Sequence, residues 1–179
     1  MDLRKLSMSE LGRLSTEEFR AADKFPVTVV LDDIRSQNNT GSVFRTCDAF
    51  KVESLYLCGI TAVPPHREIH KTALGAEESV RWKYFSSASG AILELKKLGY
   101  LVLALEHTTS GIPLQNYEIS SHPKIALVFG NEIQGVNEES LQLADACLEI
   151  PQFGTKHSLN VSVAVGITLW EILKKMKII

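Results

Sequence analysis

Five polar residues, spread over three separate stretches of the chain, are of the types that could do chemistry on a bound molecule. Asn39 and Arg45 lie in the first stretch, Glu132 in the second, and Ser158 and Asn160 in the third. A guanidinium together with amide and hydroxyl groups suits the binding of a hydroxyl group beside a phosphate. Because arginine stays protonated in proteins, Arg45 can fix an anion but is a poor general base.

The first stretch begins a helical pattern, and Asn39 is placed to cap it. Gly41 and Ala49 share a face with Arg45, and their small size would let a phosphate or ribose approach the guanidinium. The plainer interpretation is a surface arginine that pairs with a nearby carboxylate, either Asp48 or Asp32.

The second stretch places Glu132 between Gly130 and Gly135, directly after the apolar run 125–129. A carboxylate that follows a buried strand and is flanked by glycines suggests backbone shaped around a ligand. An ordinary tight turn is the alternative.

In the third stretch, Pro151 and Gly154 break an apolar run, and Ser158 or Asn160 can cap the helix that follows. Residues 161–170 of that helix are almost entirely apolar. A helix that is apolar all round is buried, and we expect this one to lie inside its own domain or against another subunit.

The elements that must position these stretches alternate between strands and helices. Continuous apolar runs predict strands over 27–31, 54–58, 101–105, 125–129 and 147–150. Helical patterns cover 41–50, 86–98, 137–144 and the C-terminal segment. This alternation predicts an α/β fold with a mostly parallel, Rossmann-like sheet covered by helices on both faces. Such sheets bind ligands at the carboxyl ends of their strands, where the polar stretches lie.

Residues 1–25 are predicted to be a helical extension, and residues 26–179 a single domain. The extension should form one or two short amphipathic helices that cover the edge of the core. Ser15 and Glu18 fit a capping box. The apolar side would be supplied by Leu3, Leu6, Leu11 and Leu14.

Composition narrows the classes of function. The 179 residues are 45% hydrophobic and 22% charged, an ordinary globular balance. No apolar run is long enough for a membrane span, and the first residues lack the apolar core of a secretory signal. Three cysteines without CxxC spacing indicate a reducing, cytoplasmic compartment. The absence of GxGxxG argues against a dinucleotide-binding enzyme.

The net charge of −2 is unusual for a protein that grips nucleic acid. A local basic patch would be needed, and residues 64–71 form a basic loop in which Arg67 and Lys71 could contact phosphates. Arg81 and Lys83 lie close by in sequence; a solvated loop is nearly as good an interpretation. His66 and His70 have a spacing that zinc could use, but no third ligand is evident, so we expect no metal.

Taken together, the three stretches resemble three motifs of one family, in that family's order. Residues 39–49 match N-x5-R-T-x-D-A, residues 130–135 match G-x-E-x-x-G, and residues 150–164 carry IP, a glycine and SLNVSVA. These are motifs of the SpoU, or TrmH, class of the SPOUT RNA methyltransferases. The resemblance implies methyl transfer from S-adenosyl-L-methionine to a ribose 2′-OH of tRNA or rRNA. It also implies a C-terminal deep trefoil knot and a homodimer joined by the C-terminal helix.

By the same resemblance, Arg45 is essential for transfer and contacts the RNA, while Asn39 and Glu132 lie in the active site. Ser158 and Asn160 would orient Arg45 and the ribose. Backbone groups would hold the cofactor near Leu105, Gly130, Ile150 and Leu159. An RNA-binding relative without transfer activity is the alternative.

A ribose target is also favoured by the aromatic residues. An enzyme that methylates a base would be expected to stack aromatic side chains on it. In this chain Phe44, Phe50, Phe129 and Phe153 are expected mostly in the core, because they lie mostly in apolar runs.

Overall fold

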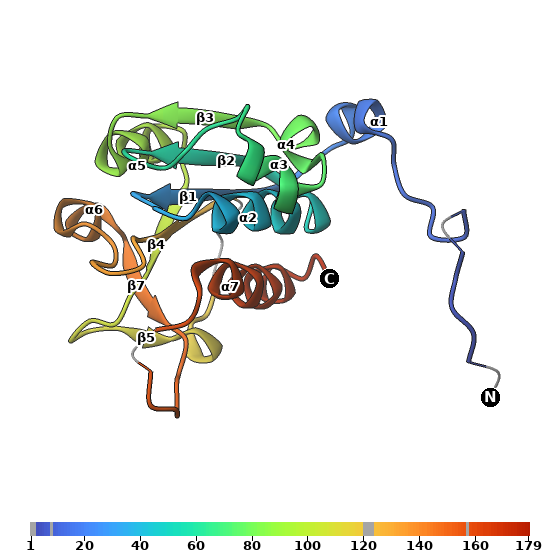
Figure 1. The fold of residues 1–179 in the computed structure, drawn as a ribbon. Coiled ribbons are helices and arrows are strands. Elements are labelled where there is room, and N and C mark those ends of the chain that lie inside the picture. Colours follow the sequence, from blue (N-terminus) through green and yellow to red (C-terminus); the bar gives the residue numbers. More distant parts are fainter. Residues whose placement is uncertain (1–2, 8, 120–123, 157) are drawn as a thin grey trace.

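The computed structural model describes residues 3–7, 9–119, 124–156 and 158–179. Its centre is a seven-stranded sheet with the order β3-β2-β1-β6-β4-β7-β5 (Figure 1). All strand pairs in the described part of this sheet are parallel. The strands are β1 (Phe25–Asp32), β2 (Val52–Cys58), β3 (Trp82–Phe85), β4 (Leu101–Leu105), β5 (Ile112–Pro113), β6 (Ile125–Phe129) and β7 (Ala146–Glu149).

Helices cover both faces of the sheet. They are α1 (Thr16–Ala21), α2 (Gln37–Ala49), α3 (Arg67–Ala73), α4 (Ala76–Ser79), α5 (Ala88–Lys97), α6 (Glu138–Leu143) and α7 (Val161–Lys175), with a 3-10 helix η1 at Leu114–Asn116. Alternate strand residues point to opposite faces, so Val29 packs with α2, α3 and α7 while Val30 packs with α5. Burial on both faces explains why the strands are continuously apolar.

The order of the strands reverses beside β1. From β1 the chain builds β2 and β3 on one side, and then crosses to build β4, β6, β7 and β5 on the other. A crevice forms outside the carboxyl ends of the strands at such a point, which is where doubly wound proteins bind ligands. The loops after β1, β4, β6 and β7 all leave the sheet at this edge.

The predicted α/β fold and its parallel sheet are confirmed. The five predicted strands correspond to β1, β2, β4, β6 and β7. Two strands were missed because β5 is only two residues long and β3 is a short edge strand with two exposed residues. The prediction of a basic loop over residues 64–71 was wrong in part, because Arg67–Ala73 forms the helix α3, which is capped by the His66 side chain.

The N-terminal prediction was wrong in its packing. The capping box of Ser15 and Glu18 is present, and α1 follows it. However, the four leucines before it are 41 to 89% exposed, and the segment runs away from the domain instead of covering its core (Figure 1). No second helix forms in residues 3–7 and 9–15. The division at residues 25 and 26 stays a prediction.

Gly41 serves helix packing and not ligand access. A Cβ atom there would lie 2.1 Å from Thr72 Oγ1 and 2.3 Å from the Ile69 carbonyl oxygen, so only glycine lets α2 approach α3 this closely. The prediction that small residues leave room for a ligand beside Arg45 therefore rests on Ala49 alone.

The trefoil knot stays a prediction. In the described parts of the chain, none of the helices has the length and apolar character that a membrane span requires.

Candidate functional site

The Glu132 carboxylate ties two loops together at the carboxyl edge of the sheet. It follows β6, and it accepts hydrogen bonds from the loop after β1: from the Arg35 backbone N–H at 3.1 Å and the Ser36 backbone N–H at 3.2 Å. It also accepts one from Asn39 Nδ2, in the first turn of α2, at 3.0 Å. Glu132 therefore fixes the start of α2 relative to the end of β6.

The same hydrogen-bonded chain continues to the third motif. Asn160 Nδ2 donates to Asn39 Oδ1 at 3.0 Å, while Asn160 Oδ1 caps α7 by accepting from the Ser162 backbone N–H at 2.8 Å. Glu132 of the second motif, Asn39 of the first and Asn160 of the third are thus joined by consecutive hydrogen bonds. The prediction that Asn39 caps α2 was wrong, because Ser36 is the cap and Asn39 instead uses its side chain to join the other two loops.

Hydrogen bonding keeps Glu132 ionised. Partial burial alone would raise the pKa of its carboxyl group, but the bonds from its own backbone and from Arg35, Asn39 and Ser36 outweigh burial, and the pKa is lowered. The site therefore contains a fixed negative charge at neutral pH.

Beside this chain of bonds is a cavity of about 280 Å³. It opens at the carboxyl ends of β4, β6 and β7. The four residues predicted to hold a cofactor all line it, as do Glu132 and Ser158. The lining comprises Leu105, Glu106, His107, Phe129, Gly130, Asn131, Glu132, Ile133, Gln134, Gly135, Leu148, Glu149, Ile150, Gln152, Ser158, Leu159, Val161 and Ala164. Its volume is close to the lower end of the range of about 300–1,000 Å³ for small-molecule sites.

The charges around the cavity select for a cation. Glu106, Glu132 and Glu149 line it, whereas no lysine or arginine does so among the residues that the structure describes. Apolar walls from Leu105, Leu159 and their neighbours would receive a flat aromatic group. An adenosyl group joined to an amino acid through a sulfonium carries two positive charges and one carboxylate, so its net positive charge suits this lining better than the anionic pyrophosphate of a dinucleotide does.

Glu106 and His107 were missed as lining residues by the sequence reasoning. The Glu106 carboxylate accepts from the Val136 and His107 backbone N–H groups, each at 2.9 Å, and so holds the loop after β6 against β4. His107 Nδ1 lies 3.2 Å from a Glu149 carboxylate oxygen. Their position directly after a predicted strand was the available signal, because that is where ligands bind.

The glycines of the second motif let the loop fold on itself. A Cβ at Gly130 would lie 2.0 Å from the Val136 backbone nitrogen, and one at Gly135 would lie 2.1 Å from a Glu106 carboxylate oxygen. The close approach is thus between protein groups, and it shapes the cavity wall before any ligand enters.

Arg45 lies apart from the cavity of its own chain. Its side chain is exposed and lines a separate hollow with residues 12–16, just before and at the start of α1. Among the described residues it forms no ion pair, and Asp48, its suggested partner, instead accepts a hydrogen bond from Ser79 Oγ. Neither Ser158 nor Asn160 bonds to it within the described chain, so the expected orientation of Arg45 by these residues is absent in a single copy.

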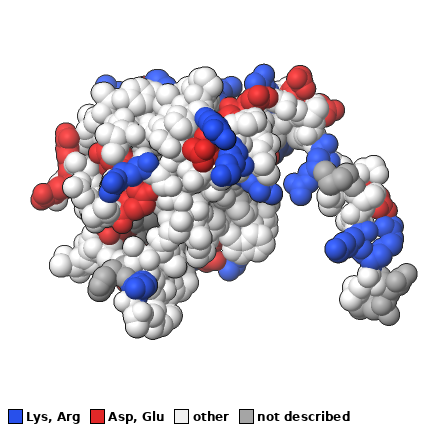
Figure 2. All heavy atoms as spheres, in the orientation of Figure 1, with Lys and Arg blue, Asp and Glu red and all other residues white. Residues whose placement is uncertain are grey.

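The basic residues, the phenylalanines and the candidate metal ligands can also be placed in the structure. Arg67 and Lys71 are exposed on α3, but Lys83 pairs with Glu94 at 2.7 Å, and basic and acidic groups are interspersed on the face in Figure 2. Phe44 and Phe129 are buried as expected, whereas Phe153 is 97% exposed, so its placement in the core was wrong. In the described residues, no three His, Cys, Asp or Glu side chains gather as a metal site would require.

A parallel sheet covered on both faces, with a cavity at its carboxyl edge, defines a doubly wound α/β ligand-binding protein. The chain belongs to the SpoU rRNA Methylase family, whose model matches residues 26–170. This range contains all three motifs, which confirms the resemblance seen in the sequence.

Named relatives and solved structures agree with this family assignment. A tRNA (guanosine(18)-2′-O)-methyltransferase of Borreliella burgdorferi is 30% identical over 151 residues, which are 84% of this chain and 67% of that protein. The crystal structure of the A. aeolicus TrmH/SpoU tRNA modifying enzyme superposes with a TM-score of 0.78 at 27% identity, covering 90% of this chain and 82% of that one. An AdoMet-bound rRNA methyltransferase from Sinorhizobium meliloti gives 0.78 at 28% identity, with 87% and 59% covered.

The central role of Glu132 leads to a stability prediction. Glu132→Gln should lower the free energy of unfolding by about 1–3 kcal/mol, because an amide N–H₂ would face donors that now meet a carboxylate oxygen. Glu118→Gln, at an exposed carboxylate without a hydrogen bond among the described residues, should stay within about 0.5 kcal/mol. Urea unfolding at neutral pH measures both variants.

The effect of Glu132→Gln should depend on pH. A carboxyl group whose pKa is lowered by folding stabilises the protein above its unfolded pKa of about 4.3, and this contribution is lost as the pH falls through the lower folded value. The difference between wild type and Glu132→Gln should therefore shrink below about pH 4. A difference that is negligible at pH 7 would contradict the role of Glu132.

Proposed function

We propose that this protein transfers a methyl group from S-adenosylmethionine to a ribose 2′-OH of tRNA or rRNA. The observation that carries the proposal is the cavity lined by three carboxylates and no described cation, joined to residues of all three family motifs. Membership of the SpoU family and the names of the relatives support the same reaction.

The residues of the cavity divide into two groups. Backbone near Leu105, Gly130, Ile150 and Leu159 would hold the adenosyl part, and the carboxylates would stabilise the positive charge of the other part. S-adenosylmethionine supplies an electrophilic methyl group on a sulfonium. As the charge on sulfur is lost during transfer, product binding should depend less on the carboxylates than cofactor binding does.

A ribose hydroxyl is a weak nucleophile, and it must lose its proton as its oxygen attacks the methyl carbon. Arg45 stays protonated and therefore cannot readily accept that proton. We assign to Arg45 the binding of an RNA phosphate beside the hydroxyl, with the phosphate oxygen sharing in the removal of the proton. Ser158 and Asn160 would orient the ribose from the entrance of α7.

A homodimer would bring Arg45 to a cavity. Arg45 lies outside the cavity of its own chain, and α7 exposes the apolar side chains Val163, Ile167 and Trp170 to the extent of 49, 40 and 57%. Exposed apolar patches of this kind mark interfaces. In the proposed dimer the α7 helices meet, and the Arg45 that serves each cavity comes from the second copy.

The RNA would be bound by a few cations close together, since the net charge of the whole chain is −2. Arg67 and Lys71 on α3 are the proposed phosphate contacts, along with Arg45. Residues 26–179 would form the catalytic domain and residues 1–25 its extension. Two buried cysteines, Cys47 and Cys58, are free thiols and support a cytoplasmic location.

Thermal unfolding tests the proposed cofactor. Ligands that bind only the native state raise the melting temperature, so S-adenosylmethionine and its demethylated product should each stabilise the protein and NAD should not. Filling the cavity with Ala164→Phe should remove both shifts. Stabilisation by NAD alone would contradict the proposed cofactor.

Substitution of Arg45 tests its proposed role. Arg45→Ala should reduce methyl transfer at least about 100-fold, because it removes a positioned charge from the transition state. Affinity for S-adenosylmethionine should be nearly unchanged, because Arg45 does not line the cavity. Lys97→Ala, which removes an exposed charge from α5 on the other face of the sheet, is the control.

Mixing two inactive variants tests whether Arg45 acts across the dimer. In a mixed dimer, the copy with Arg45→Ala has an intact cavity and receives Arg45 from the copy with Ala164→Phe, so one of the two sites is active. Since about half of the dimers are mixed after random exchange, about a quarter of wild-type activity should return. Turnover that stays absent after verified exchange would show that Arg45 acts within its own chain. RNA binding without turnover by the wild type would favour a relative that has lost transfer activity.

A further inference from the structure

The segment before α1 forms an N-terminal arm, which we define as residues 3–7 and 9–15. All of these residues are exposed, and in Figure 1 the arm runs from α1 away from the rest of the chain. Its four leucines, Leu3, Leu6, Leu11 and Leu14, are 89, 57, 41 and 49% exposed. Exposed apolar side chains gathered in one short segment mark an interaction site.

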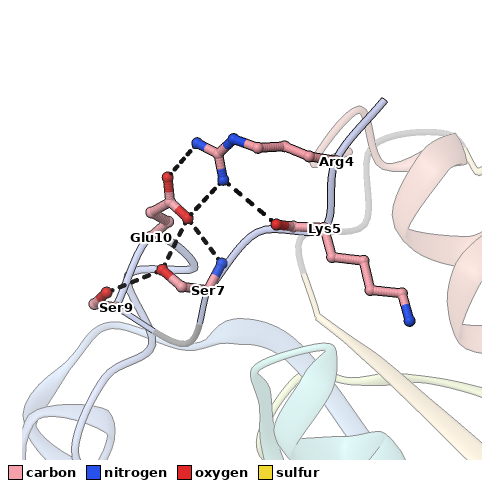
Figure 3. Close-up of polar contacts among 5 residues, drawn as sticks. All are labelled: Arg4, Lys5, Ser7, Ser9 and Glu10. Carbon is pink, nitrogen blue, oxygen red and sulfur yellow. Dashed lines mark hydrogen bonds and ion pairs between the residues drawn. The ribbon is translucent and has the colours of Figure 1, made fainter. Parts of the chain in front are cut away.

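The arm has a defined local structure. Arg4 donates to both carboxylate oxygens of Glu10, at 3.0 and 2.6 Å, and Glu10 also accepts from the Ser7 backbone N–H at 2.8 Å (Figure 3). The Leu11 N–H donates to the Ser7 carbonyl oxygen at 3.3 Å and closes a turn. These bonds bring the pKa of Glu10 to about 2, chiefly through Arg4, so the turn stays charged and paired at neutral pH.

Within the described chain, the polar contacts of the arm are internal except at Ser15, which caps α1. No hydrogen bond or ion pair in the described residues links it to the domain. The Arg4–Glu10 pair satisfies its own charges, which leaves Lys5 and Arg13 as the free cations of the arm among the described residues. Four exposed leucines against two such cations favour a protein surface over RNA, since RNA is bound chiefly through its phosphates.

The arm continues the apolar face of α7. Leu14 and Ala49, the last residue of α2, line one hollow. The next residue, Phe50, meets Trp170 edge to face, with 6.5 Å between ring centroids. Trp170 and Ile167 then line an apolar hollow beside Leu114 and Pro151. These residues form a tract from the root of the arm to the middle of α7, apolar along α7 and mixed at the root, where Asp48 and Lys51 also line the hollow.

From this continuity we infer that the N-terminal arm packs against a second copy of this chain and forms the outer part of the dimer contact. The inference rests on the homodimer proposed above and adds the arm to it. In a two-fold dimer the same tract is present on both copies, so each arm extends over the other. A stable interface buries about 800 Å² per partner, and three exposed side chains of α7 supply only a small part of that area.

The arm would also bound the RNA site. Arg13 and Leu14 line the same hollow as Arg45, so the root of the arm and the proposed phosphate-binding arginine face a common space. Anchoring of the arm on the second copy would hold the wall of this hollow in place.

Photo-crosslinking tests the arm directly in the full chain. A benzophenone amino acid replaces Leu6, and protein with light nitrogen is mixed with protein carrying heavy nitrogen before irradiation. We expect a species of twice the 19.8 kDa chain mass, containing peptide pairs with one light and one heavy member. The same probe at Leu93, a leucine 46% exposed on α5, should give no such pairs.

Other products would overturn the inference. Peptide pairs that never mix labels would show that the arm folds onto its own chain, and crosslinks to added tRNA in place of protein would assign the arm to RNA. If sedimentation shows a dimer in either case, the proposed homodimer survives and only the role of the arm fails. A monomer at micromolar concentration would contradict both.

Substitution gives an independent readout. Changing all four arm leucines to serine should raise the dimer dissociation constant at least about tenfold, since it removes the apolar area that the arm would bury on the second copy. The shift in melting temperature with S-adenosylmethionine should be retained, because the arm does not line the cavity. Changing Leu93 on α5 and Leu98 at its C-cap to serine is the control, and an equal loss of dimer there would contradict a specific role of the arm.

Discussion

The hydrogen-bonded chain from Glu132 through Asn39 to Asn160 holds the site together. These residues follow β6, begin α2 and cap α7, so a few bonds of 2.8 to 3.2 Å fix three segments that are far apart in the sequence. Glu132 and Asn39 are half-buried and hydrogen-bonded, which is the condition for a polar network to be stabilising, and Asn160 joins them from the exposed side. The cavity beside it has its shape because those segments cannot move independently.

Charge divides the site between two tasks. The cavity gathers carboxylates around apolar walls, whereas Arg45, Arg67 and Lys71 lie outside it on α2 and α3. A cationic cofactor and an anionic RNA would therefore approach from different sides. The separation also explains how a chain of net charge −2 can act on RNA, because the cations needed are few and local. The face of α7 and the N-terminal arm both expose apolar side chains, which suits contact between two copies.

The sequence was sufficient for the five longer strands, because continuous apolar runs follow from local chemistry. The family resemblance supplied four of the residues that line the cavity, but Glu106 and His107 were missed. The sequence was insufficient where the role of a residue depends on a distant partner. Asn39 looked like a cap, but its side chain is used by Glu132 and Asn160. Gly41 looked like an opening for a ligand, but α3 lies against it. Phe153 and the arm leucines looked like core residues because composition alone cannot tell which apolar side chains the domain covers.

The central claim is that the acceptor is a ribose hydroxyl. Fragmentation mass spectrometry of nucleosides from RNA treated with the protein and labelled S-adenosylmethionine locates the added methyl group directly. The account predicts that it resides on the sugar fragment, and that the linkage after that nucleotide resists alkali, since the 2′ oxygen can no longer attack the phosphate. A methyl group found on the base fragment would contradict the account, while leaving the fold and the cofactor cavity as described.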